Sequence, residues 1–281
     1  MMDRYNVRTD LALEQRERFV SDQIEIPGVA VEETYDDMCE VRVTTVRIET
    51  ENGAAVMGKP VGNYITLEAP KMAEADENYH REISGKLMEV LEGCLPEKED
   101  GQSILIIGLG NRNVTPDALG PLVVEHLDIT RHLVKEYGKY ALGGEADRIV
   151  SAVVPGVMGQ TGMETVEIVR GIVEETEPDF VIAIDALAAR SVRRLNRTIQ
   201  IADTGIAPGS GVGNHRNAIT EETVGVPVIA IGVPTVVDAA TIVGDSIEEY
   251  VAKCRDEGMR ENKEHLIPPY LYGMFVTPKD I

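Results

Sequence analysis

The chain of 281 residues has few cysteines, few basic residues relative to acidic ones, and no long hydrophobic run. Its cysteines, Cys39, Cys94 and Cys254, lie far apart without a CxxC pair, which argues against a disulfide framework or a structural zinc site. The apolar run over 180–189 is broken by an aspartate and is much shorter than the roughly 20 residues of a membrane helix. The charged N-terminus has no apolar secretory core. We therefore expect no membrane segment and a cytoplasmic location.

The charge balance is strongly acidic, because 27 Lys and Arg residues face 48 Asp and Glu residues and leave a formal net charge of −21. Such a chain repels a phosphate backbone, which argues against direct nucleic-acid binding. Hydrophobic residues make up 43% and charged residues 27% of the chain, as in globular domains, so a disordered or fibrous protein is excluded. At about 150 residues per domain, the length predicts one large domain or two small ones.

The N-terminal third favours a small β region. Residues 41–50 alternate β-branched and charged positions, and Asn52-Gly53 followed by the apolar run 54–58 predicts a hairpin. The other expected elements are an irregular or partly helical segment over 1–37, a third strand over 63–70 and an amphipathic helix over 72–91.

After residue 102, short apolar runs alternate with helical segments. Strands without polar alternation are typical of a sheet that is covered on both faces. The pattern predicts an α/β fold with a three-layer open sheet, helices on both faces, and the N-terminal β region as an elaboration. The expected strands are 103–111, 148–156, 179–187, 198–205 and 226–234, and the expected helices are 116–136, 162–176, 186–195 and 235–253, the last with Thr235 and Asp238 as a capping pair.

Ligands of open α/β sheets bind where strands end, at the carboxyl edge. This rule selects glycine-rich loops whose small residues allow another backbone to approach, whether a peptide or a phosphate group. The selected segments are 108–117, 155–162, 185–191, 203–214 and 232–238.

Asp117 lies in the first of these loops. The preceding GLGNRN string has Asn113 where a dinucleotide fingerprint requires a third glycine, which argues against NAD binding. Thr115 is a suitable N-cap and Pro116 suits the first helical position, so Asp117 is expected in the first turn of a helix. The helix dipole favours an ionised carboxylate there. The alternative interpretation is that Asp117 only caps the helix.

Asp185 interrupts the most hydrophobic run of the chain, where burial should raise the pKa of its carboxyl group. It could also be a structural aspartate that accepts hydrogen bonds from loop amides. If Asp117 and Asp185 share one crevice, an anion and an acid stand together. That pair is suited to general acid–base catalysis, including water activation against an amide.

Other candidate groups are weaker. The chain has no GxSxG nucleophile elbow and no HExxH zinc motif. Asp203 precedes a glycine-rich loop, and Asp238 is better explained by helix capping. His215 is the one histidine placed to complete a divalent metal site with the two leading aspartates.

Several segments carry motifs that are long and distinctive. They are YNVRTDLALE (5–14), GKPVGNYITLE (58–68), GLGNRNVTPDALGPLVVEHLDITRHL (108–133), PGVMGQTGMET (155–165), PDFVIAIDALAARS (178–191), IADTGIAPGSGVGN (201–214) and VPVIAIGVPTVVDA (226–239). In this order, and over most of the chain, they closely resemble the germination proteases of spore-forming bacteria.

The resemblance implies an endopeptidase that initiates degradation of small acid-soluble spore proteins during germination, located in the developing spore and spore core. It implies a zymogen with residues 1–10 as propeptide and 11–281 as a single peptidase domain, self-processed between Asp10 and Leu11. The segment from Thr9 to Glu14 resembles the family's substrate pattern of threonine and an acid, then an apolar residue, alanine and another acid.

The resemblance further implies a homotetramer without cofactor or bound metal and an atypical aspartic mechanism, whose aspartates match Asp117 and Asp185. The fold is expected to be similar to that of the hydrogenase maturation endopeptidases. Two alternatives stay open, a metal-dependent endopeptidase of that maturation type and a non-enzymatic acidic binding module for a basic or disordered partner. Glycines expected to hold an extended peptide are Gly156, Gly159, Gly209, Gly211 and Gly213.

Overall fold

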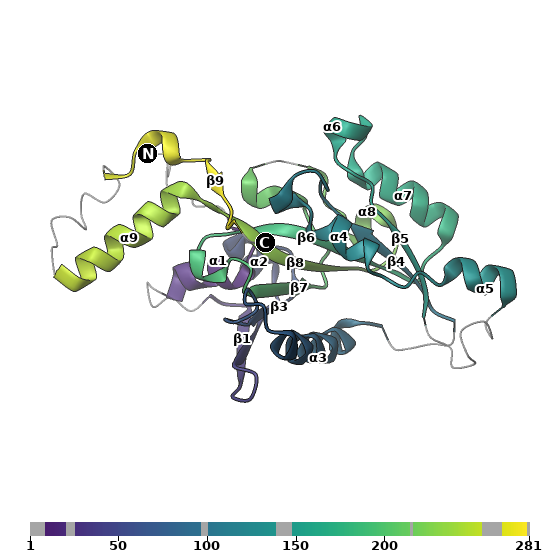
Figure 1. Ribbon diagram of the computed structural model, residues 1–281, viewed down its shortest axis with the longest axis horizontal. Helices are drawn as coiled ribbons and strands as arrows, with labels where there is room; N and C mark the ends of the chain where they lie inside the picture. The colour runs from purple at the N-terminus through teal and green to yellow at the C-terminus, as the bar shows by residue number, and fades with distance from the viewer. Residues whose placement is uncertain are drawn as a thin grey trace.

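The computed structural model describes residues 9–20, 26–96, 101–138, 148–213, 216–254 and 266–279. Within these ranges, one mixed sheet of nine strands runs through the molecule in the order β1-β2-β3-β7-β8-β6-β4-β5, and β9 pairs with β8 (Figure 1). Helices cover both faces of this sheet, so the predicted α/β class is confirmed. Its closer likeness to the hydrogenase maturation endopeptidases stays a prediction.

The second half of the chain supplies the parallel part of the sheet. The runs of apolar residues predicted as buried strands all form strands, in which β4, β6 and β8 pair in parallel and β5 pairs in parallel with β4. β7 runs antiparallel to β8 and to β3, and so joins the parallel part to the N-terminal β region. These strands are β4 (Ser103–Gly108), β5 (Ile149–Val153), β6 (Phe180–Ala189), β7 (Thr198–Ala202) and β8 (Val228–Asp238).

The N-terminal β region has a different hairpin from the predicted one. The hairpin joins β1 (Val29–Asp36) to β2 (Val41–Ile48), and β3 (Gly62–Glu68) confirms the expected third strand. Asn52-Gly53 lies instead inside α2 (Glu51–Met57), because Thr50 caps this helix by accepting a hydrogen bond from the Gly53 N–H at 3.1 Å. β1 escaped prediction because most of its side chains are exposed.

Two groups of helices cover the two faces. α3 (Glu77–Cys94) confirms the expected amphipathic helix and packs Tyr79 and Ile83 on one face, against a cluster that includes Phe180. α7 (Thr165–Thr176) packs Val169 and Val173 on the other face (Figure 1). The same face carries α1 (Ala12–Val20), α2 and α8 (Glu221–Val224).

Two helices were predicted to begin at residues that belong to strands in the structure, because these strands continue past their expected ends. β6 runs to Ala189 and β8 to Asp238, since Ala188 and Ala189 pair with Val236 and Val237. The helix expected over 186–195 is therefore wrong, and only the 3-10 turn η3 (Val192–Arg194) follows β6. α9 (Ala239–Cys254) starts after β8.

The helix expected over 116–136 is divided, and several short elements complete the fold. They are η1 (Thr115–Asp117), α4 (Leu119–Glu125), α5 (Arg131–Tyr137), α6 (Met158–Thr161), η4 (Ser210–Val212), η5 (Pro269–Leu271) and β9 (Phe275–Val276). None of the helices in the described ranges combines the length and the hydropathy that a membrane span needs. Cys39 and Cys94 are free thiols.

Candidate active site

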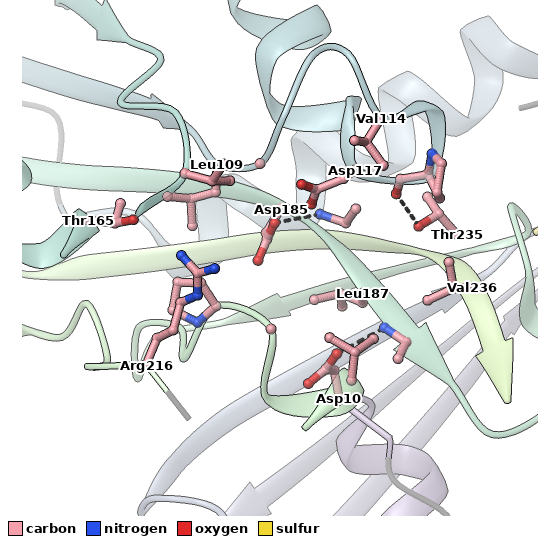
Figure 2. A pocket seen from close by; sticks show the side chains of 18 of the residues that line it. Asp10, Leu109, Val114, Asp117, Thr165, Asp185, Leu187, Arg216, Thr235 and Val236 are labelled. Atoms are coloured by element: carbon pink, nitrogen blue, oxygen red, sulfur yellow. Dashed lines mark hydrogen bonds between the residues drawn. The ribbon is translucent and has the colours of Figure 1, made fainter. Parts of the chain in front are cut away.

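A cavity of about 270 Å³ opens at the carboxyl ends of β4, β6 and β8. Every loop that the carboxyl-edge rule selected contributes to its wall, as expected for an open α/β sheet. Figure 2 shows Asp117 and Asp185 facing this space from different elements. Residues from the selected loops that line the cavity include Gly110, Asp117, Gly156, Asp185, Gly209 and Thr235.

Asp185 lies on β6 with a side chain that is only 4% exposed. Its Oδ1 accepts a hydrogen bond of 2.9 Å from the Ala186 N–H. Burial is the main reason why the pKa of Asp185 is held well above its usual value, and the negative charge of Asp117 adds to that effect. The predicted rise in the pKa of Asp185 is therefore confirmed, and the group favours its protonated form.

Asp117 reaches the cavity from η1 and is partly buried. The Asn111 N–H donates to both its backbone oxygen, at 2.9 Å, and its Oδ2, at 2.8 Å. This tight turn needs glycine at position 110, where φ is +109° and a Cβ would come within 2.1 Å of the Asp117 backbone oxygen. The loop between β4 and η1 thus aims Asp117 toward β6.

The expectation for the ionisation of Asp117 was wrong in direction. Thr115 is the first residue of the 3-10 turn rather than its cap, and Val114 at the cap position provides no side-chain hydrogen bond. Burial raises the pKa of Asp117, and the Asn111 amide and the charge of Arg216 only partly oppose this. A turn this short supplies little helix dipole, so desolvation dominates.

Arg216 is a cavity residue that the sequence interpretation did not select. Figure 2 shows its side chain among those around the cavity, and its positive charge partly opposes the rise in the pKa of both aspartates. The available signal was its place in the glycine-rich loop beside His215. His215 itself lies outside the described residues.

The predicted glycines divide into those at the cavity and those away from it. Gly156 and Gly209 line it. Gly211 contacts Asp10, because a Cβ on Gly211 would lie 2.2 Å from Asp10 Oδ2. Gly159 is exposed on α6, and Gly213 ends η4.

The two weaker aspartates have structural roles in the described part of the chain. Asp203 accepts hydrogen bonds from the backbone and side chain of Asn63, at 2.8 and 2.6 Å, and so fastens β3. Asp238 accepts from the Ala240 N–H at 2.8 Å at the start of α9, as capping predicted. Thr235 does not share in that cap, because its hydroxyl donates to the Pro116 carbonyl at 2.6 Å.

A metal centre was the remaining alternative for this site. The residues that the structure describes contain no group of three or more His, Cys, Asp or Glu side chains placed to hold an ion. Because His215 is not described, the predicted three-residue set of Asp117, Asp185 and His215 is untested.

The predicted processing residues lie at the same cavity. Asp10 lines it together with Asp117 and Asp185, and its charge contributes to the raised pKa of Asp185. The Asp10 N–H donates to the Ala188 carbonyl on β6 at 3.0 Å. Leu11, which follows, is fully buried against Leu187 and its neighbours. The N-terminal segment therefore occupies one side of the site.

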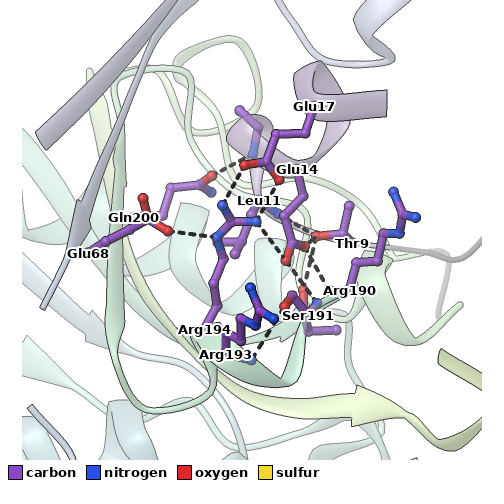
Figure 3. Close-up of polar contacts among 12 residues, drawn as sticks. Thr9, Leu11, Glu14, Glu17, Glu68, Arg190, Ser191, Arg193, Arg194 and Gln200 are labelled. Carbon is purple, nitrogen blue, oxygen red and sulfur yellow. Dashed lines mark hydrogen bonds and ion pairs between the residues drawn. The ribbon is translucent and has the colours of Figure 1, made fainter. Parts of the chain in front are cut away.

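A buried ionic cluster holds the start of α1 in this place (Figure 3). Glu14, 1% exposed, accepts hydrogen bonds from the N–H groups of Arg190 and Ser191 and from the Thr9 hydroxyl. The Arg194 guanidinium pairs with Glu14 at 3.2 Å. Arg194 also pairs with Glu17 at 2.7 Å and with Glu68 at 3.0 Å.

Comparison with known proteins assigns this arrangement to a family. The sequence profile described as germination protease matches residues 7–273. This chain belongs to the germination protease family. The family predicted from the sequence motifs is thereby confirmed, and the chain is a peptidase of spore germination.

Individual germination proteases match over nearly the whole chain. That of Caldanaerobacter subterraneus subsp. tengcongensis is 48% identical over 98% of this chain and 88% of its own length. The germination protease of Clostridium tetani is 45% identical, with 98% of this chain and 90% of the relative covered. That of Bacillus subtilis is 48% identical over 93% of this chain and 71% of its own length.

Proposed function

We propose that the chain is an endopeptidase that begins the degradation of small acid-soluble spore proteins, and that Asp117 and Asp185 carry the reaction. The observation that carries this proposal is that both carboxyl groups line one cavity from separate elements. An anion that activates water and an acid that donates a proton, held together, can provide general acid–base catalysis of amide hydrolysis.

The environments of the two groups favour one assignment of roles. Asp185 is almost fully buried and has its pKa raised well above the usual range, so it is the proton donor. The pKa of Asp117 is raised less than that of Asp185, because Asp117 is more exposed and receives the Asn111 amide, so Asp117 is the base that removes a proton from water. The resulting hydroxide adds to the peptide carbonyl carbon, and Asp185 protonates the departing nitrogen.

We also propose that the chain is made as a zymogen and cleaves itself between Asp10 and Leu11. Asp10 and both catalytic aspartates line the same cavity, and Leu11 is buried beside it. A segment in this place excludes other peptides from part of the site. Removal of residues 1–10 is therefore expected to open the cavity to protein substrates.

The catalytic proposal is tested by Asp117→Asn and Asp185→Asn in the full chain. Neither variant should release residues 1–10 or cleave a purified small acid-soluble spore protein, as followed by mass spectrometry. Asp128→Asn is the matched control, because Asp128 is exposed on the surface and should leave both reactions unchanged. Cleavage by either site variant at the wild-type rate would remove that residue from the mechanism.

A chelator arm in the same assay separates the proposal from the metal-dependent alternative. We expect the rate to be unaffected by chelator, whereas a loss that added divalent metal restores would favour the maturation-type endopeptidase. A protein that binds the substrate without turnover would favour the binding-module alternative. We also propose that the chain assembles as a homotetramer, which the native mass of the full chain measures separately.

A further inference from the structure

The carboxylate of Asp10 is held by a small set of donors beside the catalytic aspartates. Its Oδ2 accepts a hydrogen bond of 2.9 Å from the Ala188 N–H, and its Oδ1 accepts one of 2.6 Å from the Ser210 hydroxyl. Ala188 is 1% exposed, so its amide is a buried donor that needs an acceptor. Hydrogen bonds to an ionised acceptor are stronger than those between neutral groups.

The shape of this place also suits a carboxylate. Gly211 follows Ser210 in η4, and a Cβ there would meet Asp10 Oδ2 at 2.2 Å and the Ala188 Cβ at 2.8 Å. Only glycine leaves room for the acid between η4 and β6. This need for space explains Gly211, one of the glycines that the sequence analysis predicted to hold a peptide.

Separate contacts hold the backbone on both sides of Leu11. The Gln200 side chain on β7 donates from Nε2 to the Asp10 carbonyl at 3.2 Å and accepts from the Ala12 N–H at 2.7 Å. Gln200 is 8% exposed. These contacts involve no side chain of the bound segment, so they position the peptide without selecting its sequence.

A second cavity, of about 210 Å³, shares Asp10 with the first, and neither Asp117 nor Asp185 lines it. It is lined by Asp10, Gln200, Ser210 and Lys59, among others. Burial lowers the pKa of Lys59, and the negative charge of Asp10 partly opposes this, so the two groups interact across this cavity.

We propose that the Ala188 amide and the Ser210 hydroxyl form the subsite that selects an acidic residue immediately before the cleaved bond. Ser210 is the specificity-determining residue, and Gln200 is a positioning residue for the backbone around that bond. The inference rests on the proposed self-cleavage after Asp10. It extends to protein substrates, in which an acidic residue would enter the same subsite once residues 1–10 have left.

The test is a double-mutant cycle on self-cleavage of the full chain, with Asp10→Asn and Ser210→Ala alone and together. The readout is the rate at which the product beginning at Leu11 forms, measured by mass spectrometry. Ser210→Ala should slow the chain with Asp10 about 10- to 100-fold, because a hydrogen bond to a charge is lost. Ser210→Ala should slow the Asp10→Asn chain by at most about 10-fold, because the hydrogen bond lost there joins two neutral groups.

Three further variants sharpen the cycle. Gln200→Ala should slow the Asp10 and Asp10→Asn chains by the same factor, because Gln200 contacts only the backbone. Asp10→Glu, which keeps the negative charge, should slow cleavage less than Asp10→Asn does. Ser246→Ala, which removes an exposed hydroxyl on α9, should change nothing. Equal slowing of both Asp10 and Asp10→Asn chains by Ser210→Ala would overturn the subsite while leaving the proposed function intact.

A readout without catalysis separates the two proposals if the wild-type chain does not cleave itself. In the full chain carrying Asp185→Asn, hydrogen exchange at the Ala188 amide reports whether its acceptor is present. Addition of Asp10→Asn or Ser210→Ala should speed this exchange at least about tenfold. Asp10→Asn removes the charge of the acceptor, and Ser210→Ala removes the hydroxyl that holds the Asp10 carboxylate in place. Unchanged exchange would overturn the subsite independently of any activity.

Discussion

The buried carboxyl group of Asp185 lowers the stability of the fold when it is ionised. Its folded-state pKa is raised above that of the unfolded chain, so the folded state binds the proton more tightly. The stability associated with the protonated group is fully present below about pH 4 and is lost as the pH rises through the folded-state pKa. The fold therefore carries a pH-dependent cost at this position.

This cost gives a prediction for Asp185→Asn, which keeps the shape and removes the titration. The variant should have nearly the wild-type free energy of unfolding near pH 4 and increasingly exceed it as the pH rises toward 8. Urea unfolding between pH 4 and 8 measures the difference. Asp128→Asn, on the surface, should show a difference that does not grow with pH.

Sequence reasoning at the scale of single residues succeeded where one local property decides the outcome. Asp185 stands in an apolar run, so its burial followed from its neighbours. Asp117 was misjudged in ionisation, because the length of its helical turn and its burial depend on how the loop packs. Arg216 was missed, since nothing local shows that its loop turns toward β6.

At the scale of elements, α2 shows how one cap overrides a turn signal. Thr50→Ala should lower the free energy of unfolding by about 1 kcal/mol, because the Gly53 N–H loses its side-chain acceptor. Asn52→Ala should stabilise by a few tenths of a kcal/mol, since alanine is the better helix former and Asn52 is exposed. Chemical denaturation of both variants measures these changes, and destabilisation by Asn52→Ala would indicate a turn instead of a helix.

The docking of α1 depends on Arg194. Arg194→Ala should lower the free energy of unfolding by about 3–5 kcal/mol, because buried Glu14 loses its cation. Arg193→Ala is the matched control, because the Arg193 side chain is next to Arg194 in sequence but exposed. Its free energy of unfolding should stay within about 0.5 kcal/mol of wild type. Denaturant midpoints give both values, and similar losses in the two variants would argue against a specific role for Arg194.

The elements that were predicted well are those with a strong local pattern. The apolar runs of β4, β6 and β8 and the helical period of α3 needed no tertiary information. The far ends of β6 and β8 were misplaced, because each is extended by pairing with the other. Such pairing joins residues that are distant in sequence, and propensity within a short window does not contain it.

For the whole molecule, the β3–β7 pairing makes the N-terminal β region part of the same sheet as the peptidase core. Leu67 on β3 is fully buried in one cluster with Phe180 and Ile201. We therefore propose that the chain from Leu11 onward unfolds as a single domain. One core shared by both parts couples their stabilities.

Leu67→Ala tests this coupling. It should lower the free energy of unfolding by about 2–5 kcal/mol. Tyrosine fluorescence and far-ultraviolet circular dichroism should report one coincident transition, shifted equally for both probes. Val61→Ala, at a position 41% exposed, should shift it much less. Two separate transitions, of which Leu67→Ala moves only one, would show that the β region is an independent unit.

The sequence by itself determined the α/β class, the buried strands, the loops at their carboxyl ends and the two candidate aspartates, because each depends on local apolar pattern or on long family motifs. Only the tertiary structure decided which groups share the cavity and how their pKa values shift. Burial and charge proximity come from segments far apart in the chain: Asp10, Asp117, Asp185 and Arg216 meet because the strands and loops that carry them converge at one edge of the sheet.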